Sequence, residues 1–328
     1  MATRAPVLAA CLAAALIAGL AAYGAACSGG APGSNGDGDD VGGGICTCDA
    51  NGDGITFPQP DAGLADGTLD VAWMHGAASC GASPDPEWQL HAYNASTYIL
   101  RGDKCRNFEA PFVYVLVGTQ SALLLDTGAT ATPGLRDRVR ALVGGKPLLV
   151  AHTHAHGDHI ASDGAFVGQP ATTVVGTTRA AVESTFGLAP WPTAAGTYDL
   201  GERVLDVLAI PGHEGTHIAI YDRQTGLFLT GDTLYPGLLF INDWAAYRTS
   251  VHRLAQFART HVISHVLGSH IEMSAMPGVV YPYGTTYQPN EHVLQLTPAH
   301  LDELDAALTA IGATPRREVH DDFVIDPQ

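Results

Sequence analysis

The fold of this chain is decided by the stretch THAHGDH, at residues 153–159. In an extended segment, residues two apart project to the same side, so His154 and His156 can reach one ion. Asp158 and His159 follow where the chain turns into its next element. Imidazole nitrogens and carboxylate oxygens are ligands of zinc, whose catalytic sites keep a position open for water. The stretch therefore predicts a catalytic metal site.

Three later motifs each follow a short apolar run, as the histidine stretch follows the run at residues 147–151. They are PGHEGTH at 211–217, TGDT at 230–233 and GSH at 268–270. Strands that end at polar loops are the usual layout of a functional site in layered α/β proteins. The position of the histidine stretch directly after such a run therefore fits a layered α/β enzyme.

Taken in order, the four motifs resemble the signature of the metallo-β-lactamase superfamily. The resemblance implies an α/β fold, the four-layer αββα sandwich of that superfamily. One departure is Thr216, which stands where the family usually has glycine. The resemblance also implies seven metal ligands, which are His154, His156, Asp158, His159, His213, Asp232 and His270.

By the same resemblance, these ligands hold two zinc ions, with iron or manganese as alternative metals. The first ion takes His154, His156 and His213, the second takes Asp158, His159 and His270, and Asp232 bridges the two. Two close ions can deprotonate a shared water, and the resulting hydroxide would attack a carbonyl that the first ion polarises. Asp158 would orient this hydroxide, which makes it the candidate catalytic residue.

Further side chains near the motifs are candidates for supporting roles. Asp126, in the run LDTG, matches the family's aspartate that supports the metal loop from behind. His152 and His217 flank ligands and could hold them in one tautomer, although a purely structural role is an equal alternative. His265 competes with His270 as the last ligand, and the position after Gly-Ser favours His270. For the substrate pocket the candidates are Tyr235, Trp244, Met273 and Tyr283.

An aspartate at position 232 favours hydrolysis of an ester, a thioester or a lactone, because β-lactamases of this fold usually carry Cys or Ser there. Hydrolysis of a β-lactam is the first alternative. The fold also hosts mononuclear iron sulfur dioxygenases, which use only some of these ligands. A third alternative is a surface lipoprotein that binds metal without catalysis. The substrate itself is not indicated by any motif.

The apolar pattern predicts the elements that carry the motifs. Strands are expected at 112–117, 122–125, 147–151, 172–175, 204–210, 217–221, 227–230 and 262–267. Helices are expected near 178–185, 243–259 and 297–312. A further helix is expected from Pro133 to Gly144, with Leu135, Val139 and Leu142 on its buried face.

The net charge of −17, from 33 acidic and 16 basic residues, would repel a nucleic acid. We therefore expect a small-molecule substrate and no nucleic-acid partner. The 46% hydrophobic content, with 38 Gly and 20 Pro, is typical of a folded enzyme with many loops. The oligomeric state is not indicated.

The N-terminal region has the form of an export signal, with Arg4 followed by an uncharged apolar run up to Cys27. The run ends in GAACS, residues 24–28, which resembles the lipobox of bacterial lipoproteins except for Gly24. We expect an export signal over 1–27, a flexible Gly/Asp-rich tether over 28–67 and the catalytic domain over 68–328. The protein would be lipid-anchored in the cell envelope or secreted, and an uncleaved anchor is a further alternative.

Four cysteines lie beyond the expected signal, an even number that suits an oxidising compartment. A disulfide between Cys80 and Cys105 is a plain expectation, and the alternative is that Cys46 and Cys48 pair with these two cysteines. The segment DANGDG at 49–54 matches the start of a calcium loop. Because Pro60 stands where such a loop needs a glutamate, we expect a solvated acidic linker.

Overall fold

The structure is a computed structural model that describes residue 57 and residues 63–328. Contacts divide the chain into two units, Met1–Ile55 and Thr56–Gln328, of which the second is described below. The expected export signal, Cys27, the Cys46 and Cys48 pair and the segment at 49–54 lie outside the described residues.

The first sheet carries the histidine stretch at the end of one of its strands. Its six strands are, in spatial order, β1 (Trp88–Asn94), β2 (Thr97–Gly102), β3 (Phe112–Val117), β4 (Ala122–Leu125), β5 (Leu148–Ala151) and β6 (Thr172–Val174). The four strands β1 to β4 form an antiparallel meander, and β5 and β6 add in parallel. Every residue of β4 and β5 is buried, as expected of strands covered on both faces.

The second sheet carries the other ligand motifs. Its strands are, in spatial order, β13 (Gln295–Leu296), β12 (His265–Gly268), β10 (Leu227–Gly231), β9 (Ile218–Asp222), β8 (Val204–Ala209) and β7 (Ala195–Asp199). A small third sheet joins β11 (Leu238–Ile241), β15 (Val324–Pro327) and β14 (Glu318–Val319). Asp232 and His270 follow β10 and β12, two parallel neighbours, so both side chains lie at the same sheet edge.

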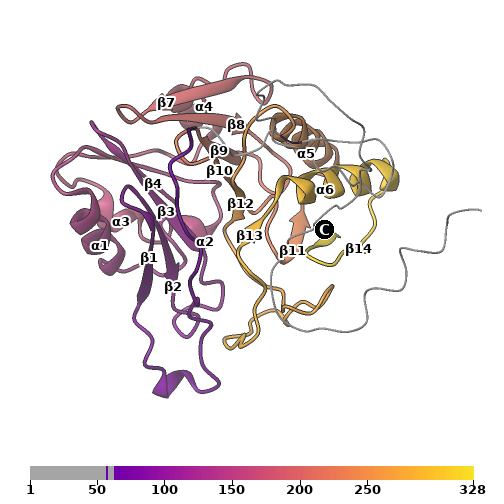
Figure 1. Ribbon diagram of the computed structural model, residues 1–328, viewed down its shortest axis with the longest axis horizontal. Coiled ribbons are helices and arrows are strands. Elements are labelled where there is room, and N and C mark those ends of the chain that lie inside the picture. Colours follow the sequence, from indigo (N-terminus) through magenta and orange to yellow (C-terminus); the bar gives the residue numbers. More distant parts are fainter. Residues whose placement is uncertain (1–56, 58–62) are drawn as a thin grey trace, which may run out of the picture. The chain divides into compact units, whose positions relative to one another are not determined.

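The helices are α1 (Gly134–Val143), α2 (Gly157–Ile160), α3 (Asp163–Phe166), α4 (Arg179–Phe186), α5 (Trp244–Ala258) and α6 (Pro298–Ile311), with a short 3-10 helix at Cys80–Ala82. Helices α1 and α3 cover the outer face of the first sheet, and α5 and α6 cover that of the second. Val182 and Phe186 of α4 instead pack into the cluster between the sheets. In Figure 1, α1 and α3 lie on one side of the two sheets, and α5 and α6 on the other.

Three apolar clusters fill the spaces between these layers. One joins the facing sheets, for example through Leu125 and Leu229. A second packs the other sheet against α5 and α6, and the third packs the first sheet against α1. Helix, sheet, sheet and helix thus form the expected αββα sandwich.

The expected element positions agree closely with the structure, with some differences. Strands β3 and β4 have the bounds predicted for them. Helix α1 begins at Gly134, and its third fully buried residue is Val143 rather than Leu142, which is partly buried on the same face. Strand β12 begins only at His265, because Val262 and Ser264 bond to residues outside the strand, Tyr221 and Gly226. Strands β1, β2, β7, β11, β13, β14 and β15 were not predicted, and neither were the short helices α2 and α3.

A disulfide joins Cys80 and Cys105, which confirms the pairing expected between these two. It ties the segment before β1 to the loop after β2, and this loop continues to Glu109 beside the metal ligands. The last residues of the expected tether also belong to the folded unit, since the Ala65 N–H donates to Gln224 O at 2.7 Å. The folded unit therefore includes Ala65, which lies before the expected domain boundary at 68.

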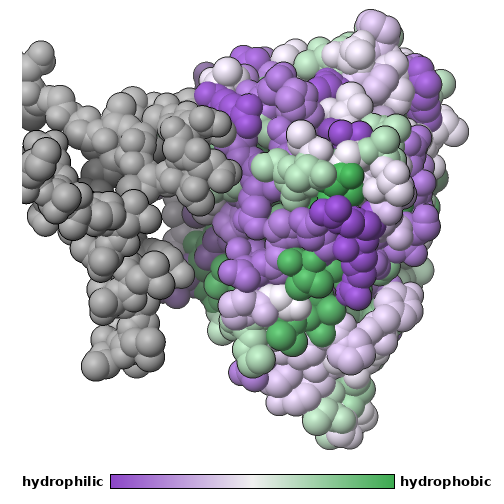
Figure 2. All heavy atoms as spheres, turned by 90° about the vertical axis from the view of Figure 1, so that its right-hand side faces the viewer, coloured by the Kyte–Doolittle hydropathy of each residue, from purple (hydrophilic) through white to green (hydrophobic). Residues whose placement is uncertain are grey.

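The surface is mixed in character. On the face shown in Figure 2, hydrophobic residues form small patches between hydrophilic ones. Within the described part of the chain, none of the helices combines the length and the apolar character needed to cross a bilayer.

Candidate metal centre

The ligand residues come from loops that follow strands of both sheets. Strand β5 leads directly into the histidine stretch, and the short helix α2 then carries Asp158 and His159. Gly231 precedes Asp232 with a φ of +53°, and a Cβ there would lie 2.6 Å from the His217 ring. Only glycine fits this position, because a side chain would meet both an unfavourable backbone angle and an imidazole.

Three histidine nitrogens form a first ligand group. Nδ1 of His156 lies 3.0 Å from Nε2 of His154 and 3.0 Å from Nε2 of His213. Nitrogen ligands at tetrahedral angles around a zinc ion are about 3.3 Å apart, because each Zn–N bond is about 2.0–2.1 Å long. The spacing of the three nitrogens therefore fits a small divalent cation.

Asp158, His159, Asp232 and His270 form a second ligand group. Oδ2 of Asp158 lies 3.2 Å from Nε2 of His159 and 3.4 Å from Nε2 of His270. The two imidazole Nε2 atoms are themselves 3.4 Å apart. This group also has the spacing of tetrahedral ligands, and its mixture of nitrogen and oxygen suits zinc.

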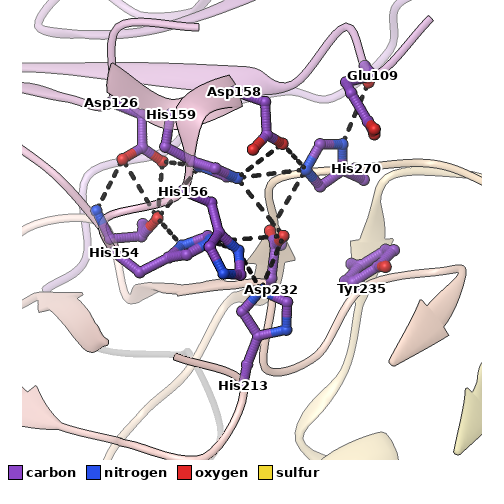
Figure 3. Close-up of polar contacts among 12 residues, drawn as sticks. Glu109, Asp126, His154, His156, Asp158, His159, His213, Asp232, Tyr235 and His270 are labelled. Carbon is purple, nitrogen blue, oxygen red and sulfur yellow. Dashed lines mark hydrogen bonds and ion pairs between the residues drawn. The ribbon is translucent and has the colours of Figure 1, made fainter. Parts of the chain in front are cut away.

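Asp232 lies between the two groups (Figure 3). Its Oδ2 is 3.4 Å from Nε2 of His159 in the second group, and 3.6 Å and 3.8 Å from Nε2 of His213 and His154 in the first. Its Oδ1 is buried, accepts no hydrogen bond from the described residues and lies 3.4 Å from Nε2 of His270 in the second group. A buried carboxylate oxygen without a hydrogen bond is costly, and a bound cation would satisfy it. The residues thus fit a pair of bridged metal ions.

Hydrogen bonds fix the tautomers of three ligands. Nδ1 of His213 donates to Phe240 O at 2.7 Å, and Nδ1 of His270 donates to Glu109 O at 3.2 Å. In His159, Nδ1 donates to Asp126 Oδ2 at 3.0 Å. In each case Nε2 is left to face the cluster, which is the usual arrangement of metal-binding histidines.

The two groups differ in their protonation. Burial lowers the pKa of His154 well below its ordinary value, and it also lowers the pKa of His213. Burial acts in the same direction on His159 and His270, but the charge of Asp232 and its neighbours outweighs it and raises both pKa values well above the ordinary range. Without metal, His154 and His213 are therefore neutral, whereas His159 and His270 carry protons.

The three predicted supporting residues, Asp126, His217 and His152, differ in whether they contact a ligand residue. Asp126 contacts His159 as expected, and His217 Nε2 accepts the Asp232 N–H at 3.1 Å. His152 instead bonds to Asp163 on α3 at 2.8 Å, and no hydrogen bond to a ligand is seen for it in the described structure. His265 belongs to neither ligand group.

A cavity of about 330 Å³ opens over the ligands and is lined by Tyr235 and Tyr283, as predicted. Two predicted pocket residues do not line it. Trp244 faces α6, where its Nε1 donates to Gly312 O at 2.9 Å, and Met273 is completely buried. The prediction missed other residues of the cavity, which are Glu109, Phe240, Asn242, Glu272 and Gln328.

Comparison with known proteins assigns the family. The model of the metallo-beta-lactamase superfamily matches residues 106–270, just over half of the 328-residue chain. The chain belongs to this superfamily, and its described residues contain two His/Asp groups that could hold metal ions.

Two curated relatives match parts of the chain. Acyl-coenzyme A thioesterase MBLAC2 of Gallus gallus is 31% identical over 80 residues, 23% of this chain and 28% of that protein. Hydroxyacylglutathione hydrolase of a Synechococcus strain is 28% identical over 134 residues, 38% of this chain and 50% of that protein. The matched region thus spans half or less of either relative.

Solved structures with a similar fold include a metallo-beta-lactamase from Pontibacter korlensis, at 18% identity and a TM-score of 0.47. That match covers 68% of this chain and 99% of the other. The DIM-1 metallo-beta-lactamase matches at 14% identity and a TM-score of 0.48, and the match covers 69% of this chain and 99% of the other.

Proposed function

We propose that this protein is a dinuclear zinc hydrolase that cleaves an ester, a thioester or a lactone. The observation that carries the proposal is the position of Asp232, whose carboxylate lies within 4 Å of histidine nitrogens from both ligand groups. One aspartate shared by two groups is what a pair of neighbouring ions requires. The first ion would take His154, His156 and His213, and the second Asp158, His159 and His270.

When bound, a pair of zinc ions lowers the pKa of a water and polarises a carbonyl oxygen. The protein's own residues position the reactants. Asp158 is only partly buried and lines the cavity, so its carboxylate can accept a hydrogen bond from the attacking water and hold it toward the substrate. Tyr235 forms a wall rather than a proton donor, because its hydroxyl already bonds to Leu238 O and Glu272.

The reaction class is supported by the ligand at position 232 and by the relatives. An aspartate there resembles the thioester and lactone hydrolases of the superfamily more than its β-lactamases. Both curated relatives carry names of enzymes that hydrolyse thioesters. The relatives match over short segments, so the bond that is cleaved has to be tested directly.

A substrate panel on the full-length zinc-loaded protein tests this proposal. We expect hydrolysis of at least one thioester, lactone or aryl ester, and its loss in the His156→Ala variant. Hydrolysis of β-lactams alone would contradict the proposed class. Equal turnover by the wild type and His156→Ala would contradict metal-dependent catalysis and favour a binding protein.

We further propose that the protein is exported, as a lipoprotein or in secreted form. The apolar run that ends at Cys27 supports this, and so does the Cys80–Cys105 disulfide, since disulfides persist in oxidising compartments. Expression of the wild type and Cys27→Ala, followed by fractionation, tests it. Membrane recovery that depends on Cys27 is expected for a lipoprotein, and recovery of both forms in the cytoplasm would contradict export.

A further inference from the structure

The cavity over the metal ligands has an acidic wall. Four carboxylates line it, from Glu109, Asp158, Asp232 and Glu272, and no lysine or arginine does so among the described residues. Asp158 and Asp232 belong to the ligand groups, where bound cations would neutralise them. Glu109 and Glu272 have no such role, so their charges are left facing the substrate.

Glu272 is held rigidly at the inner end of this wall. Its Oε2 accepts the Leu238 N–H at 3.0 Å and the Tyr235 hydroxyl at 3.1 Å. These donors orient the carboxylate without neutralising it. Lys104 lies behind it and offsets part of its charge, but the lysine is 2% exposed and its ammonium donates to Phe108 O at 3.0 Å. The lysine therefore does not line this cavity, although it lines a smaller neighbouring one beside Glu109, Glu272 and Tyr283.

Glu109 lies at the mouth of the cavity beside an exposed aromatic ring. Tyr283 is 76% exposed and packs edge-on against Phe108, with ring centroids 4.8 Å apart. The charge of Glu109, together with a side-chain hydrogen bond between the two residues, raises the pKa of Tyr283. A carboxylate beside an aromatic ring is a combination that attracts organic cations, because ring faces bind ammonium groups.

We propose that Glu109, Glu272 and Tyr283 form a subsite for a cationic group of the substrate, such as the ammonium of an amine-bearing ester or thioester. This inference rests on the proposed hydrolase function and names the substrate class for it. Anionic substrates, such as thioesters that carry phosphate groups, meet like charge at the same wall and are disfavoured.

The test compares substrates of equal shape and different charge. An ester of choline and the ester of 3,3-dimethylbutanol with the same acyl group differ only in one charged atom. We expect kcat/KM of the full-length zinc-loaded protein to be about tenfold higher for the choline ester. Added salt should reduce this ratio, because the Glu109 carboxylate is partly exposed to solvent. A ratio of one or less would overturn the proposal.

Two variants test which residues cause the preference. Glu109→Gln should lower the ratio, with Glu272 and Tyr283 still in place, and Tyr283→Ala should lower it by removing the ring. Glu303→Gln is the matched control, since Glu303 is an exposed glutamate on α6 outside the cavity, and it should keep the wild-type ratio. If Glu109→Gln keeps the wild-type ratio, the Glu109 carboxylate does not cause the preference for the cationic ester, which would contradict the proposed subsite.

Direct binding separates this inference from the hydrolase function. Calorimetry with choline and with 3,3-dimethylbutanol measures the preference even in a protein that hydrolyses neither ester. We expect choline to bind about tenfold more tightly. Equal binding of the two alcohols would overturn the subsite. Tighter binding of choline without hydrolysis of any ester, thioester or lactone would support the subsite and contradict the proposed function.

Discussion

Oδ2 of Asp126 lies 3.0 Å from Nδ1 of His159, and both side chains are fully buried. Oδ1 of the same carboxylate accepts the Thr153 N–H at 2.7 Å, so Asp126 holds the histidine stretch at its first residue and its last. Asp126 has a φ of +69°, a value that non-glycine residues rarely adopt. Backbone strain of this kind is retained where it positions a functional side chain.

Replacing Asp126 tests this support of the metal ligands. Asp126→Asn should lower zinc affinity about 10–100-fold, because an amide cannot accept from both Thr153 and His159 as the carboxylate does. Competition with a coloured chelator measures the affinity. Asp137→Asn, on the exposed side of α1, is the control and should bind zinc like the wild type. An affinity for Asp126→Asn that matches this control would show that the contact is dispensable.

Zinc binding should depend on pH differently in the two ligand groups. His159 and His270 have raised pKa values and hold protons in the metal-free protein, whereas the pKa values of His154 and His213 are lowered. Ligation requires neutral imidazole, so filling the second group releases protons, and its affinity falls as the pH falls. Lowering the pH should therefore empty the second group first. Calorimetry in buffers of different ionisation enthalpy measures the released protons, and zinc uptake without any proton release would contradict this account.

Lys104 should make stability rise with pH. Burial, and then the charge of Arg101, lower its pKa from 10.5 to about 8. The unfolded chain therefore binds more protons than the folded chain between these values, and the free energy of unfolding increases as the pH rises through them. Burial of the protonated lysine lowers the free energy of unfolding by about 3 kcal/mol below pH 8, and this destabilisation is gone by about pH 10.5. Lys104→Met should remove this slope in urea unfolding, and equal slopes for the two proteins would contradict the buried charge.

A buried ion pair connects the two halves of the fold. Arg203 donates to Asp222 Oδ2 at 2.6 Å within the second sheet, and to Ser96 O at 2.7 Å at the start of β2. Asp222→Asn leaves the guanidinium charge unpaired in the core and should lower the free energy of unfolding by about 3–5 kcal/mol. Glu183→Gln breaks the more exposed Arg179–Glu183 pair and should cost less than about 1 kcal/mol. Similar decreases in the free energy of unfolding for Asp222→Asn and Glu183→Gln would contradict the expected difference between the buried and the more exposed ion pair.

The ligand positions could be predicted because local sequence determines them. Each ligand follows a short apolar strand within a few residues, and strands buried on both faces have a strong hydrophobic signal. The choice of His270 over His265 also follows from this rule, since β12 ends at Gly268 and His265 begins it. Strand β1 was missed although its Trp88, Leu90 and Ala92 alternate with Gln89 and His91, a pattern that indicates a strand.

The cavity walls could not be predicted because they depend on tertiary packing. The Glu109 carbonyl accepts from His270, which is 161 residues further along the chain, and no local pattern indicates that contact. Trp244 follows Asp232 closely in sequence, yet the first turn of α5 directs it to Gly312 O, away from the metal ligands. Glu272 had a weaker signal that was overlooked, as an acidic residue only two positions beyond a ligand.

The metal content of the purified protein tests the central claim most directly. Elemental analysis, followed by chelation and stepwise return of zinc, measures how many ions the chain holds and how many its hydrolysis needs. We predict about two zinc ions per chain, with Asp232→Ala retaining no more than one and losing hydrolysis. A single iron per chain, with oxygen consumption and no hydrolysis, would contradict the proposed dinuclear hydrolase.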